Sequence, residues 1–501
     1  MNFLKFVHVS IVLLGTGLSA TTHAIDLYVD TKTKQIYIEP GEGREHLGSF
    51  KREDSVSESI GQESAQNAQK PQTRQINSSE ESIASPTPPV TSATPVMASK
   101  RSEHKSNKID VSLGEGGLKF GTQDDNFKFK LGGRIHADAS FSQGDDFMDA
   151  NGNPIEANDG TEIRRGRMVF QARFFRDWDY ITQIDFADNN VSVKDLSIKY
   201  TGLGFMDVVV GQHKQAFSRE LQESSNDLLF IERSVANAIT GTTVDRAIGL
   251  NLFAYNATTT AQVGLYGDTL DANKRNMQAD EGWSVSSRIT HAPLLDGNNT
   301  INLGINGNYR KPDDAGDVSG KPLVMQTEST HMSNLNLAKA NVNNVDNYKM
   351  IGGDATAVMG PFSVGGEYTQ IWIDRENGEP SLSFSGWFGE AAWTLTGESR
   401  IFNKGEFNRV KPKKNFSLSK GGLGAWEIAV RYAEVDLNHH SFKGGELANF
   451  SVGLNWYINP NVRLMAGYDK LLNTKDSPLR KRNGGSIENM DTFQFRTQLA
   501  F

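Results

Sequence analysis

The sequence predicts an all-β fold, an antiparallel β-barrel that crosses a membrane, and three observations predict it. The last ten residues, 492–501, alternate between apolar and polar side chains. Only 37% of the 501 residues are hydrophobic and 48 are glycine, which is little for a globular core. After residue 24, no uninterrupted apolar run is long enough for a membrane helix. A barrel with a wet lumen fits all three, because only one face of each strand must be apolar.

The final strand fixes which face of a strand meets lipid. Side chains two residues apart share one face of an extended chain. We expect the apolar set to face lipid and the polar set to face a watery lumen. The apolar set is Phe493, Phe495, Leu499 and Phe501, and the polar set is Gln494, Arg496 and Gln498.

Residues 1–24 predict a secretory signal peptide. Lys5 supplies a positive start, residues 7–18 are mostly apolar, and residues 22–24 (THA) offer a cleavage site. The absence of cysteine is compatible with an oxidising periplasm. Export without helical spans places the chain in the bacterial outer membrane. The net charge of -8 argues against a nucleic-acid partner.

Composition divides the exported chain into three parts. Residues 25–50 hold two short β-like pieces and are interpreted as a short periplasmic arm. Residues 51–117 form a low-complexity linker, which is rich in Ser, Gln, Glu, Thr and Pro over most of its length and is predicted to be disordered. Residues 118–501 are assigned to the barrel. The mature chain is therefore expected to be a barrel with an N-terminal periplasmic extension.

The barrel region contains sixteen alternating runs, which predicts 16 strands. In the first run Arg134 and His136 point inward, while Leu131 and Ile135 point outward. The runs begin near residues 129, 165, 180, 193, 206, 246, 260, 283, 300, 348, 362, 384, 425, 447, 461 and 490.

Connection lengths give an independent test of this count. The outer connections 141–163, 213–246 and 310–348 are long, as outer loops of such barrels are. Connections 175–177 and 359–361 are tight, as periplasmic turns are. The connection over about 397–424 is long where a periplasmic turn is expected. Either the count slips there or this turn is a real elaboration.

Inward bases outnumber inward acids, which predicts a lumen that selects anions. Guanidinium groups stay protonated and match oxyanions in a bidentate manner. The densest cluster is the Arg-Arg-Gly-Arg run at 164–167. An alternative stays open, in which the arginines pair with opposing carboxylates and brace the wall. The basic residues predicted from the strands to line the pore are Arg134, Arg164, Arg165, Arg167, Arg173, Arg431, Arg463 and Arg496.

Six motifs, taken in order, resemble the phosphate-selective porin O and P family over residues 118–501. As a set they are specific, although each is short. They are KLGGR at 130–134, VGQHKQAFS at 210–218, FIERS at 230–234, LTGESR at 395–400, GAWEIAVRY at 424–432 and LNWYINPNVRL at 454–464.

The resemblance implies a passive trimeric channel for small hydrophilic anions, such as phosphate or phosphorylated solutes. It implies a third outer loop folded into the lumen and an arginine ladder leading to an anion site. Arg134 and the pair at 164–165 resemble wall arginines near that constriction. Segment 215–233, together with Lys214, resembles the infolded loop, whose further bases are Arg219 and Arg233. Phe501 is expected to be recognised by the outer-membrane assembly machinery.

The same loop also carries four acids, which favours an alternative. A general diffusion porin for other small polar solutes, with weak or no phosphate selectivity, would tolerate them. The acids are Glu220, Glu223, Asp227 and Glu232.

An enzyme on a barrel is not predicted. Such an enzyme would need a nucleophile, a base and an orienting group that converge on the wall, and none of the ten histidines has such a setting. No His or carboxylate spacing indicates a metal site, and no cofactor is expected.

Overall fold

The computed structural model describes residues 25–30, 36–37, 39–50, 109–149, 151–270, 280–312, 322–328, 331–333 and 335–501. The predicted signal peptide, 1–24, and residues 51–108 of the predicted linker lie outside these residues. The chain divides into two compact units, 1–100 and 101–501. In the first unit, a three-stranded sheet with the order β2-β1-β3 forms within the predicted arm. Its strands are β1 (Ile25–Asp30), β2 (Ile36–Tyr37) and β3 (Arg44–Phe50).

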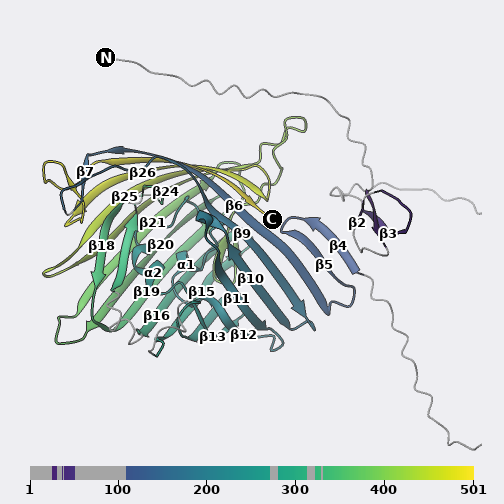
Figure 1. The fold of residues 1–501 in the computed structure, drawn as a ribbon, viewed down its shortest axis with the longest axis horizontal. Helices are drawn as coiled ribbons and strands as arrows, with labels where there is room; N and C mark the ends of the chain where they lie inside the picture. Colours follow the sequence, from purple (N-terminus) through teal and green to yellow (C-terminus); the bar gives the residue numbers. More distant parts are fainter. Residues whose placement is uncertain are drawn as a thin grey trace, which may run out of the picture. The chain divides into compact units, whose positions relative to one another are not determined.

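In the second unit, sixteen antiparallel strands form a closed barrel, which confirms the predicted fold class (Figure 1). The last strand pairs with the first and closes the ring. Every predicted run overlaps one strand. The strands are β6 (Phe127–Gly144), β9 (Gly160–Phe174), β10 (Trp178–Asp185), β11 (Ser192–Tyr200), β12 (Met206–Lys214), β13 (Arg246–Tyr255), β14 (Thr259–Tyr266), β15 (Trp283–Asp296), β16 (Asn299–Lys311), β19 (Val345–Met359), β20 (Phe362–Arg375), β21 (Leu382–Thr394), β24 (Ala425–His439), β25 (Phe442–Tyr457), β26 (Val462–Lys475) and β28 (Met490–Ala500).

A hairpin extends the wall beside the start of β6. It consists of β4 (Ile109–Gly114) and β5 (Gly117–Thr122), and β5 pairs with β6 through Leu118 and Leu131. Residues 109–117 therefore belong to the barrel sheet, and their assignment to the linker was wrong. Their backbone donors and acceptors pair in the sheet, which a compositional argument about bulky apolar residues does not detect.

Strand alternation separates the lipid face from the lumen face as predicted. On β28, Phe493 and Phe495 are 47% and 51% exposed, whereas Arg496 and Gln498 are 2% and 0% exposed. A soluble protein would bury the first pair and expose the second. The pattern is inverted because the outer face meets acyl chains and the inner face meets polar groups.

The two ends of the barrel differ in their connections. One end carries short turns such as 175–177 and 360–361, and this end is periplasmic in barrels of this kind. The opposite, outer end carries most of the long loops. We name residues 215–245 loop L3, residues 312–344 loop L5, and the periplasmic connection 395–424 the long turn.

The long connections contain short elements of their own. L3 holds α1 (Arg219–Gln222) and α2 (Asn237–Thr243), which lie within the barrel in Figure 1. No helix in the described part of the chain is long and apolar enough to cross a membrane. The other elements are η1 (Ala187–Asn189), the L5 hairpin of β17 (Leu323–Glu328) and β18 (Asn336–Val342), the long-turn hairpin of β22 (Ile401–Asn403) and β23 (Glu406–Asn408), and an outer three-stranded sheet of β7 (Phe147–Met148), β8 (Pro154–Ile155) and β27 (Arg480–Lys481).

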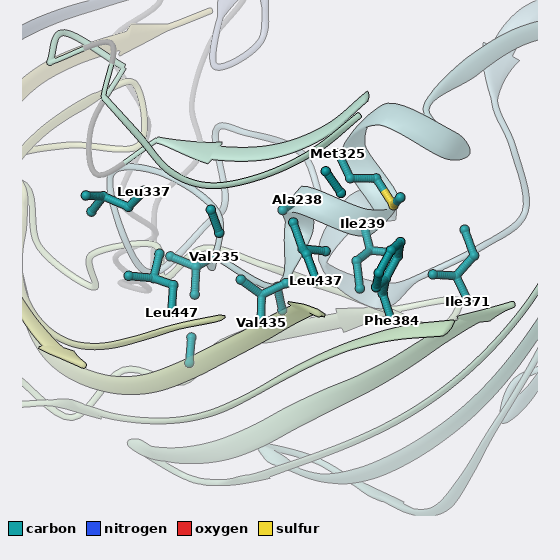
Figure 2. Close-up of a cluster of buried hydrophobic side chains, with 14 of the residues drawn as sticks. Val235, Ala238, Ile239, Met325, Leu337, Ile371, Phe384, Val435, Leu437 and Leu447 are labelled. Atoms are coloured by element: carbon teal, nitrogen blue, oxygen red, sulfur yellow. The ribbon is translucent and has the colours of Figure 1, made fainter. Parts of the chain in front are cut away.

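An apolar core fills part of the lumen toward the outer end (Figure 2). L3 contributes Ile239 and L5 contributes Met325, and both are 0% exposed. They pack on inward side chains of β20, β21, β24 and β25. The inward side chains of β6 to β16 are instead mostly polar, as at Gln183, Asn251 and Asn302. The labelled core residues are Val235, Ala238, Ile239, Met325, Leu337, Ile371, Phe384, Val435, Leu437 and Leu447.

Two glycines in the KLGGR motif permit the ring to close. The amide of Gly133 donates to the Phe501 carbonyl at 2.8 Å, and the Phe501 amide donates to the Gly133 carbonyl at 3.0 Å. A Cβ atom on Gly132 would lie 2.5 Å from the Phe501 carbonyl oxygen, and one on Gly133 would lie 2.6 Å from the carbonyl of Arg167. The backbone approach that closes the barrel therefore excludes side chains here.

We predict that Gly132→Ala lowers the fraction of chains that form a closed barrel, because the added methyl group must displace the backbone of Phe501. The free energy of unfolding should fall by about 1–3 kcal/mol. The measurement is urea unfolding together with the folded fraction seen as an unheated gel band. Gly389→Ala is the matched control, since a Cβ atom on that strand glycine meets nothing within 4 Å. Equal folded fractions for the two variants would contradict the prediction.

Candidate functional site

L3 crosses the lumen, and polar side chains of the wall fix its backbone. The Nη2 group of Arg463 donates to the carbonyl of Leu228 at 3.0 Å, and the Nδ2 group of Asn455 donates to that of Leu229 at 2.9 Å. These carbonyls belong to an irregular stretch that has no strand partner. Buried carbonyls need donors, so the inward residues of β25 and β26 supply what a sheet neighbour would.

Glu232 on L3 is the centre of the largest charge cluster. Its carboxylate lies 3.2 Å from Nε of Arg164, 3.0 Å from Nη1 of Arg165 and 2.8 Å from Nη2 of Arg496. Arg496 also binds Asp138 at 2.6 Å. One loop acid therefore joins β9 to the closing strand β28, and three arginines share two carboxylates.

The protonation state of Glu232 follows from these neighbours. Burial acts to raise the pKa of Glu232, but the positive charges of Arg165, Arg164 and Arg496 outweigh it and hold this pKa well below its usual range. Glu232 lies on the loop and not on a membrane-spanning strand. The carboxylate therefore stays ionised at neutral and mildly acidic pH, and the cluster persists there.

A β-bulge aims two consecutive arginines into the lumen. Arg165 on β9 lies opposite His136 on β6, and Ile163 on β9 lies opposite the next residue of β6, Ala137. The intervening Arg164 therefore has no partner residue on β6. Simple alternation would send Arg164 to the lipid face. The extra residue re-aims the strand, so that both guanidinium groups reach Glu232.

Three further predicted bases are buried where L3 meets the wall. Arg219 is 1% exposed and binds Glu223 at 3.3 Å and Glu390 at 2.8 Å. Arg431 is 5% exposed and lies 4.2 Å from the ring centre of Phe230. Arg463 is 1% exposed. Loop packing therefore buries all three of these side chains, and whether they line the pore stays a prediction.

Arg134 differs from the other wall arginines. Its Nη1 group donates to the hydroxyl of Ser225 at 2.8 Å and to that of Ser224 at 3.4 Å, and its buried Nε has no hydrogen-bond partner. Among the described residues, no carboxylate lies within ion-pair distance of it. Arg134 is therefore a cation at the junction of wall and loop that retains hydrogen-bonding capacity.

The remaining predicted bases have partners of several kinds. Arg167, opposite Arg134 in the sheet, binds Asp185 at 2.6 Å. Arg173 binds Asp179 at 2.6 Å near the periplasmic end, away from L3. The last two predicted bases bind backbone carbonyls of L3. Lys214 donates to the carbonyls of Gln222 and Glu223 at 2.9 and 3.1 Å, and Arg233 donates to the carbonyl of Glu220 at 2.9 Å.

The long turn enters the lumen from the periplasmic side. The Nη1 group of Arg409 donates to the carbonyl of Asn226 on L3 at 3.3 Å, and Arg400 lies 3.6 Å from Glu223. A Cβ atom on Gly405 would lie 2.7 Å from the hydroxyl of Thr290 on β15. The strand count is therefore correct, and the long turn is a real elaboration that extends into the lumen and contacts L3.

Sequence reasoning missed the polar groups that complete this constriction. Ser224 and Ser225 carry no charge, and they drew no attention in a search for bases. Arg400 and Arg409 belong to a connection that was expected to be a periplasmic turn. Its unusual length, and the LTGESR motif that ends at Arg400, were the signals available.

A closed sixteen-stranded barrel with an infolded outer loop defines the class of outer-membrane porins, which are passive channels. The profile of the family described as "Phosphate-selective porin O and P" matches residues 129–501. The chain therefore belongs to that family and is a porin of the bacterial outer membrane. Family and fold indicate a channel rather than an enzyme.

Individual proteins that resemble this chain share a low sequence identity with it. Porin O of Pseudomonas aeruginosa is 27% identical over 417 residues, which cover 77% of this chain and 91% of that protein. An uncharacterized protein of Caulobacter vibrioides is 27% identical over 350 residues, 68% of each chain. The solved structure of an anion-selective porin from Comamonas acidovorans superposes with a TM-score of 0.48 at 12% identity, covering 75% of this chain and 100% of that one.

We predict that Glu232→Gln loosens L3, since three guanidinium groups lose a shared carboxylate, at a cost of up to about 3 kcal/mol. Limited proteolysis of L3 and open-channel current noise should both increase. Glu115→Gln is the control, because its ion pair with Lys411 is more than half exposed and contributes little. Unchanged noise and protease resistance would show that Glu232 does not hold the loop.

Proposed function

We propose that the porin passes small hydrophilic anions selectively, with phosphate or phosphorylated solutes as its substrates, at a site around Arg134. The observation that carries the proposal is the pairing of this guanidinium with two serine hydroxyls instead of a carboxylate. The other wall arginines near L3 have acids or carbonyls as partners. An oxyanion can therefore compete for Arg134 without displacing a fixed negative charge.

The local chemistry suits an oxyanion. Ser224 and Ser225 accept from Arg134, which leaves their hydroxyl protons free to donate to a bound anion. Arg167 stands opposite Arg134 across the strand pair, and Asp185 balances only one of these two positive charges. One net positive charge and several donors then face the passage. This combination favours anions while leaving binding weak enough for release.

A second candidate is a general diffusion porin for other small polar solutes. The observation that favours it is the extensive neutralisation of lumen bases, by Glu232, Glu223, Glu390 and Asp227 among others. Small-sugar flux that is unchanged by saturating phosphate would support this candidate. Strong block of that flux by phosphate would support the selective channel.

We predict that Arg134→Gln lowers the anion-to-cation permeability ratio by about tenfold, since a unit charge beside the ion is worth on the order of 1–3 kcal/mol at intermediate dielectric. Reversal potentials in planar bilayers under a salt gradient measure it, and block of chloride current by phosphate should weaken in parallel. Arg176→Gln, on an exposed periplasmic turn, is the control. A cation-selective unmodified channel, or equal ratios for both variants, would refute the proposed role.

We also propose that the chain assembles as a homotrimer and that the outer-membrane assembly machinery recognises Phe501. Support for the trimer is family membership. Support for the recognition is the outward ring of Phe501, which is 43% exposed beside the closing strand. Sedimentation in detergent tests the trimer, and the insertion yield of Phe501→Ala in cells tests the recognition.

A further inference from the structure

The second half of the long turn leaves the lumen and covers the outer face of β24 and β25. Trp426 and Trp456 are paired in register at the periplasmic ends of these strands and stack at 5.0 Å. They face outward, because their neighbours Glu427 and Asn455 are 1% and 0% exposed toward the lumen. Phe416 of the long turn packs edge-on against Trp456 at 5.0 Å. This part of the turn therefore lies where lipid headgroups would meet the barrel.

The tip of this segment is held in a fixed shape. Ser417 and Gly422 exchange two backbone hydrogen bonds of 2.9 and 3.1 Å, and the amide of Lys420 donates to the Ser417 hydroxyl at 3.2 Å. Both indole N–H groups donate to the Leu423 carbonyl, at 3.3 and 3.0 Å. The tryptophan pair thus anchors the tip to the membrane-facing belt.

The fixed tip presents apolar and basic side chains together. Leu418 is 91% exposed and Leu423 is 67% exposed. Lys414 precedes both leucines and Lys420 lies between them. The two lysines are exposed and have no ion-pair partner among the described residues. Because these hydrogen bonds fix the turn, the Leu418 side chain cannot fold back onto the protein. Its exposure is therefore explained by a medium outside the barrel.

We propose that residues 414–423 are a docking site for anionic phospholipids of the periplasmic leaflet. Leu418 and Leu423 enter the acyl region, and Lys414 and Lys420 bind headgroup phosphates. Lipid is favoured as the occupant because the tip continues the belt formed by Trp426, because it lies at the periplasmic end, and because its lysines complement phosphate. The site is separate from the solute passage, so it does not depend on which anion the channel prefers.

The depth of the tip can be measured directly, because the chain contains no cysteine. A Leu418→Cys variant is labelled with an environment-sensitive fluorophore and reconstituted in vesicles of phosphatidylethanolamine and phosphatidylglycerol. We expect a blue-shifted emission that is quenched by lipids carrying a shallow nitroxide and is protected from aqueous iodide. Ser441→Cys, in the short outer connection between β24 and β25, is the control that iodide should reach. Quenching at position 418 by iodide alone overturns the proposal.

The headgroup contact is tested separately with the unlabelled protein. Each lysine near an anionic surface is worth about fivefold in affinity, so Lys414→Gln with Lys420→Gln should weaken phosphatidylglycerol binding by about 25-fold. Native mass spectrometry against a phosphatidylglycerol titration measures this. Lys443→Gln with Lys475→Gln, at the outer end, is the matched control.

Three outcomes would overturn the lipid site. The first is equal phosphatidylglycerol affinity for the two double variants. The second is an equal loss of affinity for phosphatidylcholine, which would remove the headgroup preference. The third is crosslinking between Leu418→Cys barrels, which would assign the tip to a contact between copies. Single-channel conductance of each variant verifies folding and should remain at the unmodified value.

Discussion

The structure depends on the polar attachment of L3 to the inner wall. The Glu232 carboxylate forms ion pairs with three arginines, and side chains of the wall donate hydrogen bonds to the carbonyls of residues 228 and 229. An irregular loop inside a barrel can be ordered only if its backbone groups find such partners. Once L3 is fixed, its α2 helix contributes to the apolar core together with L5.

The same attachment divides the basic residues into two roles. Arg219, Arg463 and Arg496 are buried braces, because their guanidinium groups satisfy loop carbonyls and carboxylates. Arg134 retains unused donor capacity because its loop partners are neutral serines. Under the proposed function, anion preference thus depends less on how many inward arginines there are than on which of them L3 leaves without an acid.

The long turn links both surfaces of the barrel. Its first half carries the β22–β23 hairpin into the lumen, where Arg409 contacts L3. Its second half returns over the lipid face, where Phe416 packs on Trp456. A single periplasmic connection therefore reaches both L3 in the lumen and the outward tryptophans, because it runs from the inside of the wall to the outside at the strand ends.

The sequence by itself determined the barrel, its sixteen strands and, where the strands alternate regularly, which residues face the lumen. Because lipid lies outside the barrel and polar groups lie inside, apolar and polar side chains must alternate along each strand, as Phe493 and Arg496 illustrate on β28. Only the tertiary structure decided that residues 109–117 join the sheet, that a bulge turns Arg164 inward, and that Arg134 alone among the wall arginines near L3 meets neutral hydroxyls. The arginine contacts depend on pairings between distant residues, Arg164 with Glu232 and Arg134 with Ser225, which are 68 and 91 positions apart and which local alternation does not encode.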